Sequence, residues 1–534
     1  MASGGVGTLA TAAEIFADEG KLAFLMSLSS ASMRLRSVDT DPTDHVNTVE
    51  KAKSGVNAPT VAFEAAGWKV ATEHLTMLNA VDMPTLKPVK SSSKNFPSVG
   101  LESGIFTNKN GAALVARSDD ALFVAFRGSN DIDGGIGRSP DSSQWDIDKR
   151  DDHYKLFNKL TKAIETYVAE HPEITKVYIT GHSLGGGMVN AFMQSHPGSI
   201  YEAVSFGSIR YGHGASQADD RVTNVWNDAD IALALGGRAD GDSIKFKVVG
   251  PDSISEHMPW LYQAEIKFVS HLGYDIEDLT GYHRIVLGAT ATGLFSSGIG
   301  ISNDELVGTG RKDLMLGGRG SDRMQGLAGA DRIDGGEGSH DAAIYSEKHA
   351  GIDVTLDGDF WIDVLVGGVA EDRIRSVEDI AGGFGNDTII GDARSNYLAG
   401  NGGNDWLDGA DGNDVLYGGL GRDTLIGSDG RDFFVFDTRP GRADADVIFD
   451  FTPGQDKIRL DADIYDAIGN TLNVKEFYAA AGATKAHDRT DHIVYNTDNG
   501  KLYYDADGKG GHSSVLIAKL EDAPILTSHQ FDIV

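Results

Sequence analysis

The sequence predicts an α/β domain followed by an all-β parallel β-roll, and three observations carry this prediction. Apolar, β-branched runs alternate with amphipathic stretches as far as about residue 300. Glycine then becomes frequent, with 28 of the 67 glycines in the 129 residues from Gly308 to Phe436. A nine-residue period appears in the same region and runs without a gap from Gly382. The 534 residues therefore divide into parts of different construction.

The first part, residues 1–300, has the pattern of an α/β domain. The runs Ala121–Phe126 and Val177–Thr180 are short, apolar and β-branched, which is typical of buried strands. The stretch His153–Glu170 is predicted to be an amphipathic helix. Its apolar residues recur every four positions: Leu156, Leu160, Ile164 and Val168.

The second part contains repeats of nine residues. From Gly382 the units read GGFGNDTII, GDARSNYLA, GNGGNDWLD, GADGNDVLY, GGLGRDTLI and GSDGRDFFV. An earlier block reads GTGRKDLML, GGRGSDRMQ and GLAGADRID, and ends in a distorted GGEGSHD. The pattern G-G-x-G-x-D-x-U-x, in which U is an apolar residue and x any residue, is typical of a calcium-binding parallel β-roll. We predict this roll over residues 301–436, with an insert at about 342–381, and a C-terminal β cap over 437–534.

Each position of the repeat has a physical role in such a roll. Glycine permits backbone conformations that other residues avoid, and turns of this kind expose carbonyl oxygens. The aspartate at position six supplies a carboxylate, so that stacked turns can provide the six to eight oxygen ligands of calcium. The predicted ligands are Asp313, Asp322, Asp331, Asp387, Asp405, Asp414, Asp423 and Asp432, and Asn396 in place of aspartate should weaken its site.

The apolar residue at position eight is predicted to face the interior of the roll. These residues are Ile389, Leu398, Leu407, Leu416 and Leu425. Stacking of coils cannot by itself neutralise so many carboxylates, so we expect several structural Ca²⁺ ions and an unfolded roll without them.

Composition excludes several classes of partner. The chain has 79 acidic and 47 basic residues, a formal charge of −32, which disfavours nucleic acids and an electrostatic membrane anchor. It has no cysteine, which excludes disulfides and thiolate sites. The first basic residue is Lys21, so no secretory signal peptide is expected. The stretch Ile285–Asn303 is rich in Gly, Ser and Thr, which predicts a linker rather than a membrane span.

A candidate nucleophile follows the predicted strand at residues 177–180. The segment Gly181-His-Ser183-Leu-Gly185 is a G-x-S-x-G motif between a strand and a helix, and its glycines permit a tight turn that exposes the serine hydroxyl. The helix that follows can offer free N–H groups to an oxyanion. Upstream, Phe126-Arg-Gly-Ser129 follows the strand at 121–126, where a second oxyanion loop is expected.

FRGS together with GHSLGG resembles the class 3 lipase family and the lipases that carry RTX repeats, over roughly residues 60–290. The resemblance implies an α/β-hydrolase fold, with the backbone N–H groups of Ser129 and Leu184 as oxyanion donors. The segment around Asp230 resembles the family's N-x-x-D-I-V, which implies Asp230 as the catalytic acid, with Asp228 as the alternative. Val269-Ser-His271-Leu-Gly-Tyr resembles its H-L-x-Y segment, which implies His271 as the base; the alternatives are His257 and His283.

The resemblance implies serine ester hydrolysis, in which His271 accepts the proton of Ser183 and Asp230 orients the imidazole. The loop-like stretch from Asp131 to Asp152 favours a plain solvated surface loop. The alternative is a lid, with Asp133, Asp146 and Asp148 as ligands of a further calcium.

Residues 304–534 resemble the C-terminal half of RTX proteins exported by type I (ABC-transporter) secretion. The resemblance implies an uncleaved C-terminal export signal, consistent with the ending Phe531-Asp-Ile-Val534. We therefore expect a secreted, extracellular and monomeric triacylglycerol lipase or carboxylesterase that meets its lipid or ester substrate at an interface. The alternatives are a phospholipase A1, a serine peptidase, and a calcium-dependent adhesin with an inactive hydrolase domain.

Overall fold

The structure is a computed structural model. It consists of two compact units, the first ending at Ile285 and the second beginning at Val286. The described residues are 10–19, 21–33, 69, 74–88, 99–108, 111–127, 154–182, 184–207, 219, 221–227, 242–248, 269, 279, 284–287, 303–441 and 444–534. In these residues no helix combines the length and the apolar character needed to cross a membrane.

The first unit is built on a mixed sheet. Strands β2 to β5 are antiparallel neighbours, and β5 to β9 continue the sheet as parallel neighbours in chain order. The strands are β1 (Thr76–Met77, paired with β4), β2 (Gly100–Glu102), β3 (Ile105–Asn108), β4 (Gly111–Arg117), β5 (Ala121–Phe126), β6 (Lys176–His182), β7 (Tyr201–Phe206), β8 (Val222–Asn227), β9 (Asp242–Val248) and β10 (Arg284–Leu287).

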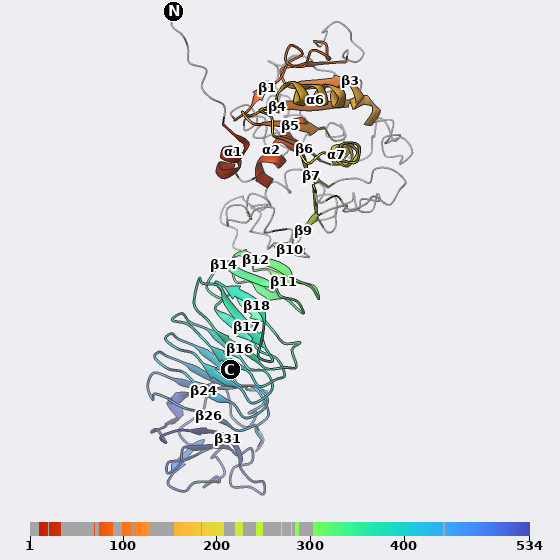
Figure 1. The fold of residues 1–534 in the computed structure, drawn as a ribbon. Coiled ribbons are helices and arrows are strands. Elements are labelled where there is room, and N and C mark those ends of the chain that lie inside the picture. The colour runs from red at the N-terminus through yellow and green to blue at the C-terminus, as the bar shows by residue number, and fades with distance from the viewer. Residues whose placement is uncertain are drawn as a thin grey trace, which may run out of the picture. The chain divides into compact units, whose positions relative to one another are not determined.

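Helices cover both faces of this sheet (Figure 1). Helices α1 (Ala12–Glu19) and α2 (Lys21–Met33) lie on one face, where the ring of Phe24 packs 5.6 Å from that of Phe123. Helices α6 (Asn158–Glu170) and α7 (Leu184–Ser195) share the apolar core of the other face with Leu122, Val124 and Phe126. Strand β5 is thus buried on both faces, which explains its continuous apolar run.

The predicted strand at 121–126 is confirmed as β5, and the strand at 177–180 lies within β6. The predicted helix His153–Glu170 differs at its start. A 3₁₀ turn, η4 (Lys155–Phe157), precedes the α-helix, which begins at Asn158. Phe157 at the end of this turn is buried against Phe126, so tertiary packing sets the boundary.

The second unit is a roll of short strands in two sheets. The first sheet is parallel throughout: β11 (Glu305–Val307), β13 (Arg323–Gln325), β15 (Ala342–Ile344), β19 (Asp379–Ala381), β21 (Tyr397–Ala399), β23 (Val415–Tyr417), β25 (Phe433–Phe436), β27 (Lys457–Leu460) and β32 (Phe531–Ile533). Successive strands of this sheet in the repeat region stand 18 residues apart, or two nonapeptides.

The second sheet of the roll holds β12 (Asp313–Arg319), β14 (Arg332–Glu337), β18 (Val369–Arg375), β17 (Ile362–Val366), β16 (Ile352–Thr355), β20 (Thr388–Ile390), β22 (Trp406–Asp408), β24 (Thr424–Ile426), β26 (Asp446–Ile448) and β31 (Val515–Leu520), in this spatial order. Pairing is parallel except around β17, which is antiparallel to both neighbours. The cap adds β28 (Phe477–Ala480), β29 (Ile493–Asn496), β30 (Lys501–Tyr504) and the 3₁₀ turn η6 (Ser528–Gln530).

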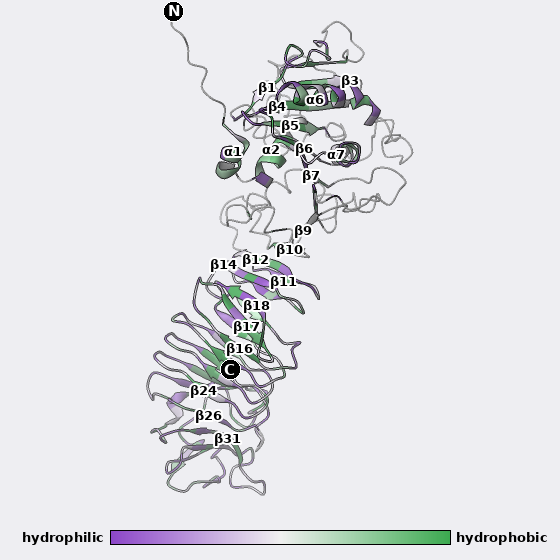
Figure 2. Ribbon diagram, in the orientation of Figure 1, coloured by the Kyte–Doolittle hydropathy of each residue, from purple (hydrophilic) through white to green (hydrophobic). Residues whose placement is uncertain are grey.

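The residues at position eight of the repeat face the interior, as predicted. All five are completely buried, and identical positions of successive coils stand in register, for example Leu398 with Leu416 and Phe434. Figure 2 shows the apolar residues on the strands of the roll and the hydrophilic ones along its turns. The interior therefore contains a column of apolar side chains, to which each of these strands contributes its residue at position eight.

The stretch at 342–381 lacks the repeat signature but contributes strands to both sheets. Strand β15 continues the first sheet from β13 to β19. In the second sheet a hairpin of β17 and β18 is closed by Gly367 and Gly368, both with positive φ, as a tight two-residue turn requires. The residues Phe531–Ile533 likewise form β32, which is the last strand of the first sheet.

Truncation of one interior residue tests how much this column stabilises the roll. Leu425 is completely buried between Leu407 and Ile448, so Leu425→Ala should lower the free energy of unfolding in saturating calcium by ~2–5 kcal/mol. Its half-buried neighbour Thr424 is the matched control, with an expected change within about 0.5 kcal/mol for Thr424→Ala. Chemical denaturation of a 286–534 fragment measures both; equal losses would contradict the inward orientation of Leu425.

Candidate functional site

Acidic side chains form two ladders along the roll, one at the start of each sheet's strands. The backbone N–H of one rung donates to a carboxylate oxygen of the next, as from Asp387 to Asp405 (2.7 Å) and from Asp414 to Asp432 (2.9 Å). Ladder A comprises Asp313, Asp331, Asp372, Asp387, Asp405, Asp423 and Asp446. Ladder B comprises Asp304, Asp322, Asp341, Glu378, Asn396, Asp414, Asp432 and Asp456.

The second carboxylate oxygen of most rungs is buried without a hydrogen-bond donor. This applies to one oxygen each of Asp313, Asp322, Asp331, Asp341, Asp372, Asp405, Asp414, Asp423 and Asp432. Burial of an ionised oxygen without a partner is costly, so such oxygens indicate a cation. Asp387 differs, because both of its oxygens accept backbone N–H groups, from Ile352 and from Gly383.

The first glycine of each repeat leaves room beside these oxygens. A Cβ placed on Gly317 would lie 2.5 Å from Asp322 Oδ2 and 2.5 Å from the carbonyl oxygen of Gly335. A Cβ on Gly308 would similarly lie 2.7 Å from the carbonyl oxygen of Gly326. Carboxylate and carbonyl oxygens therefore converge on the same small space, and this donor set fits calcium, which prefers oxygen ligands.

The electrostatics of the ladders lead to the same conclusion. Burial, together with the negative charges of neighbouring rungs, raises the pKa of Asp331 and of Asp414 to about 8. Burial raises the pKa of Asp405 to about 7, again with help from the rungs on either side. A bound divalent cation would reverse these shifts, because it favours the ionised form.

All eight aspartates predicted as ligands are rungs of the ladders, as is Asn396. The structure adds rungs that the sequence analysis missed: Asp304, Asp341, Asp372, Glu378, Asp446 and Asp456. Two of them carried a signal. Asp341 stands one position late in GGEGSHD, and Asp372 ends GGVAED, which keeps the first two glycines and the aspartate of the repeat.

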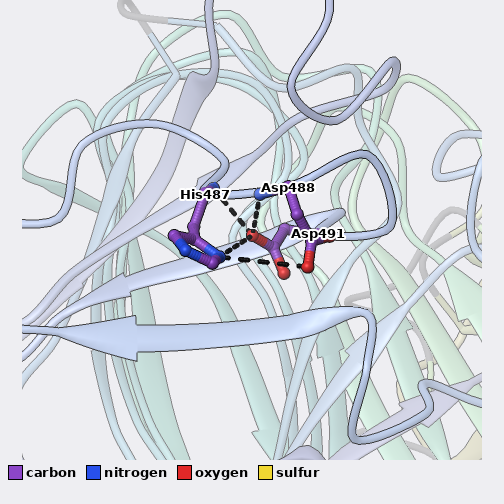
Figure 3. Close-up of side chains that lie close together, drawn as sticks. All are labelled: His487, Asp488 and Asp491. Carbon is purple, nitrogen blue, oxygen red and sulfur yellow. Dashed lines mark hydrogen bonds and ion pairs between the residues drawn. The ribbon is translucent and has the colours of Figure 1, made fainter.

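A histidine and two aspartates gather in the cap, outside the ladders. Ligand atoms of His487, Asp488 and Asp491 all lie within 4.8 Å of one another (Figure 3). Asp491 Oδ2 accepts the backbone N–H groups of His487 and Asp488, each at 2.7 Å, and the His487 ring stacks on Tyr478. These contacts indicate that the cluster closes a loop of the cap.

The predicted nucleophile lies in sequence between β6, which ends at His182, and α7, which begins at Leu184. Of the proposed catalytic and oxyanion residues, the structure describes Leu184 alone, as the first residue of this helix. Outside the described residues lie Ser183, Asp230, His271 and Ser129, the alternatives Asp228, His257 and His283, and the lid candidates Asp133, Asp146 and Asp148.

The two glycines of G-x-S-x-G lie against the end of β5. A Cβ on Gly181 would lie 2.6 Å from the carbonyl oxygen of Gly185 and 3.0 Å from that of Phe126. A Cβ on Gly185 would collide with the Phe126 carbonyl oxygen and lie 3.0 Å from the Arg127 carbonyl carbon. The start of α7 thus approaches the residues that open the FRGS segment. Arg127 is buried there, and burial lowers its pKa to about 10.

Comparison with known proteins identifies the repeats. The model of the RTX calcium-binding nonapeptide repeat (4 copies) matches residues 307–339, 381–416 and 408–437, so the chain carries RTX calcium-binding repeats. No curated protein matches the chain.

Several solved structures are similar to parts or all of the chain. Extracellular lipase LipA from Serratia marcescens is 17% identical over 97% of this chain and 98% of its own, with a TM-score of 0.39. The AlgE6R3 subunit of the mannuronan C5-epimerase from Azotobacter vinelandii is 28% identical over 28% of this chain and 78% of its own, with a TM-score of 0.20. The Rhizomucor miehei lipase propeptide complex is 18% identical over 47% and 78%, with a TM-score of 0.24.

Proposed function

We propose that the chain is a secreted serine ester hydrolase of the lipase type, stabilised by calcium bound in its RTX roll. The observation that carries this proposal is that strand β6 and helix α7 flank Ser183 of the G-x-S-x-G motif directly, with both glycines of the motif packed against the end of β5. This is the structural context that the motif requires when its serine is a nucleophile.

In the proposed reaction, Ser183 attacks the carbonyl carbon of an ester and His271 accepts its proton. Asp230 orients the imidazole and stabilises the imidazolium that forms. The backbone N–H groups of Leu184 and Ser129 bind the oxyanion; the place of Leu184 at the start of α7 supports its part, because the first N–H groups of a helix lack intrahelical acceptors. His271 then returns the proton to the leaving alcohol, and water hydrolyses the acyl-enzyme.

Calcium in this proposal has a structural role. The buried rungs, the unpartnered oxygens and the glycine-lined spaces support several ions between successive coils. A roll that needs calcium suits a protein that folds outside the cell, where the ion is abundant, and the proposed export route is type I secretion. The terminal residues would then form β32 after export and complete the first sheet.

The nucleophile is tested by Ser183→Ala. Release of fatty acid from a triglyceride emulsion and from phosphatidylcholine vesicles should fall on the order of 10⁴–10⁶-fold, and covalent labelling by a fluorophosphonate should disappear. Ser195→Ala, at the other end of α7, is the control and should keep both. The preferred substrate of the unmodified protein distinguishes a lipase from a phospholipase A1. Undiminished hydrolysis by Ser183→Ala would refute the proposal.

The packing of the turn is tested by Gly185→Ala. The added methyl group meets the Phe126 carbonyl oxygen, so the variant should lose ~1–3 kcal/mol of stability and most of its kcat/KM as α7 moves away from β5. Gly198→Ala is the control, because its Cβ would stay 3.4 Å from Tyr201. Melting temperature and ester hydrolysis should be measured together. A fully active, stable Gly185→Ala would count against the close approach of α7 and β5.

The calcium-free roll should depend on pH. The raised pKa values, about 8 for Asp331 and Asp414 and about 7 for Asp405, mean that the folded roll holds more protons than the unfolded chain between about pH 4 and 8. Stability without calcium is therefore greatest below about pH 4 and decreases as the pH rises from about 4 to 8. Far-UV circular dichroism of the 286–534 fragment in calcium-free buffer should show more β-structure at pH 5 than at pH 9. Saturating calcium should abolish this difference, and a calcium-free spectrum that is the same at both pH values would contradict the proposed ladders.

A further inference from the structure

In both ladders the series of aspartate rungs is interrupted at one level in the middle of the roll. Ladder B, otherwise made of aspartates, holds Glu378 and Asn396 there. Ladder A is interrupted between Asp372 and Asp387, where β17 and β16 intervene without an acidic rung. We call this level, from the Asp372 and Glu378 rungs to the Asp387 and Asn396 rungs, the junction.

An arginine contacts the altered rung of ladder B. Arg394 occupies position four of its repeat, where most other units carry glycine. Its guanidinium donates from Nη1 to Glu378 Oε1 and from Nη2 to Asp359 Oδ1 at 2.7 Å. Glu378 is buried, so this contact brings a positive charge to the carboxylate from within the chain.

Asn396 further reduces the capacity of this level to bind a cation. The amide carries no charge, and its Nδ2 donates to the backbone carbonyl oxygen of Glu378 at 2.7 Å. Its Oδ1 accepts the backbone N–H of Asp392 at 2.9 Å. One carboxylate and one carbonyl oxygen are thus removed from the set that the other coils offer.

A lysine supplies the positive charge on the other side of the roll. Lys348 is nearly buried, and its Nζ donates to the carbonyl oxygen of Leu327 and to Glu371 Oε1 at 2.6 Å. Its own carbonyl oxygen accepts the backbone N–H of Phe384, in the coil of Asp387. Lys348 therefore joins the coils on both sides of the gap in ladder A.

We propose that Arg394 and Lys348 are built-in counter-ions that replace calcium at the junction, so that calcium binds as two separate arrays. This inference rests on the proposed calcium-binding role of the ladders. A side-chain cation cannot dissociate, so the junction keeps its charge balance at any calcium concentration. A buried carboxylate accepts such a partner in place of a metal ion when its geometry and hydrogen bonds are satisfied, as those of Glu378 are.

The proposal is tested by restoring the repeat consensus in the full-length chain. The double variant Arg394→Gly/Asn396→Asp should bind one more tightly held calcium ion per chain than the unmodified protein. Asn396→Asp alone should bind the same number as the unmodified protein, because Arg394 still supplies the positive charge at this level through its contact with Glu378. Asp414→Asn, one rung further along ladder B, should bind one fewer.

Calcium per chain can be counted by atomic emission after gel filtration. A count unchanged in the double variant, or raised by Asn396→Asp alone, would overturn the role of Arg394. If Asp414→Asn kept the full count, the ladders would not be calcium sites, and the inference would fail together with that part of the proposed function. Ester hydrolysis by the same samples reports separately on the catalytic proposal.

A second measurement uses the unmodified protein and does not depend on the folding of a variant. Calcium-loaded crystals should give anomalous peaks along ladder B on both sides of the junction and none between Glu378 and Asn396. On ladder A no peak should lie beside Lys348 Nζ. A calcium peak at either place would overturn the proposal.

Discussion

We propose that the roll depends on the attraction between its buried carboxylates and bound calcium ions. After the first rung of each ladder, one oxygen of each aspartate rung accepts a backbone N–H from the preceding coil, which holds the coils in register. The other oxygen of most rungs is buried without a donor. Burial of so many like charges in rows opposes folding, since each desolvated carboxylate raises the energy of its neighbours. The hydrogen bonds therefore define the geometry of the roll, and in our proposal bound calcium ions make that geometry stable.

The apolar interior cannot take over this role. Each nine-residue unit contributes mainly the buried apolar side chain at position eight, worth ~1.5–3 kcal/mol, and it orders nine residues at roughly 1–2 kcal/mol of backbone entropy each. Coils also contact mainly their neighbours, so stability passes along the roll from rung to rung. At the junction both ladders have fewer aspartates that could bind calcium than elsewhere. The roll would be less stable there unless other positive charges were present. Lys348 and Arg394 provide those charges at this level.

The sequence predicted those features that depend on local spacing, and it missed those that depend on pairing across the fold. The buried strand β5, the inward position eight and eight aspartate rungs follow from patterns within a few residues. Asp372 and Asp446 bond to rungs 41 and 23 residues earlier, instead of 18, so periodicity could not identify them. Glu378 has no glycine turn before it and is a rung because β15 pairs with β19. In the candidate active site, the sequence predicted the strand and the helix on either side of residue 183. The acid and base were assigned only through a family resemblance, because no local spacing links them to the serine.

Glycine has two different uses in this chain, and substitutions should separate them. In the roll, the first glycine of a repeat leaves a space lined by carboxylate and carbonyl oxygens, as Gly317 does beside Asp322. A methyl group there would compete with a cation, so its cost should depend on calcium. At the turn between β6 and α7, Gly185 faces a backbone oxygen of β5, and a methyl group would push two elements of secondary structure apart whatever ion is present. The high glycine content therefore reflects ion binding in one unit and close packing of backbone in the other. The physical constraint at each glycine is therefore identified by whether the loss of stability on substitution depends on calcium. The magnitude of that loss does not identify it.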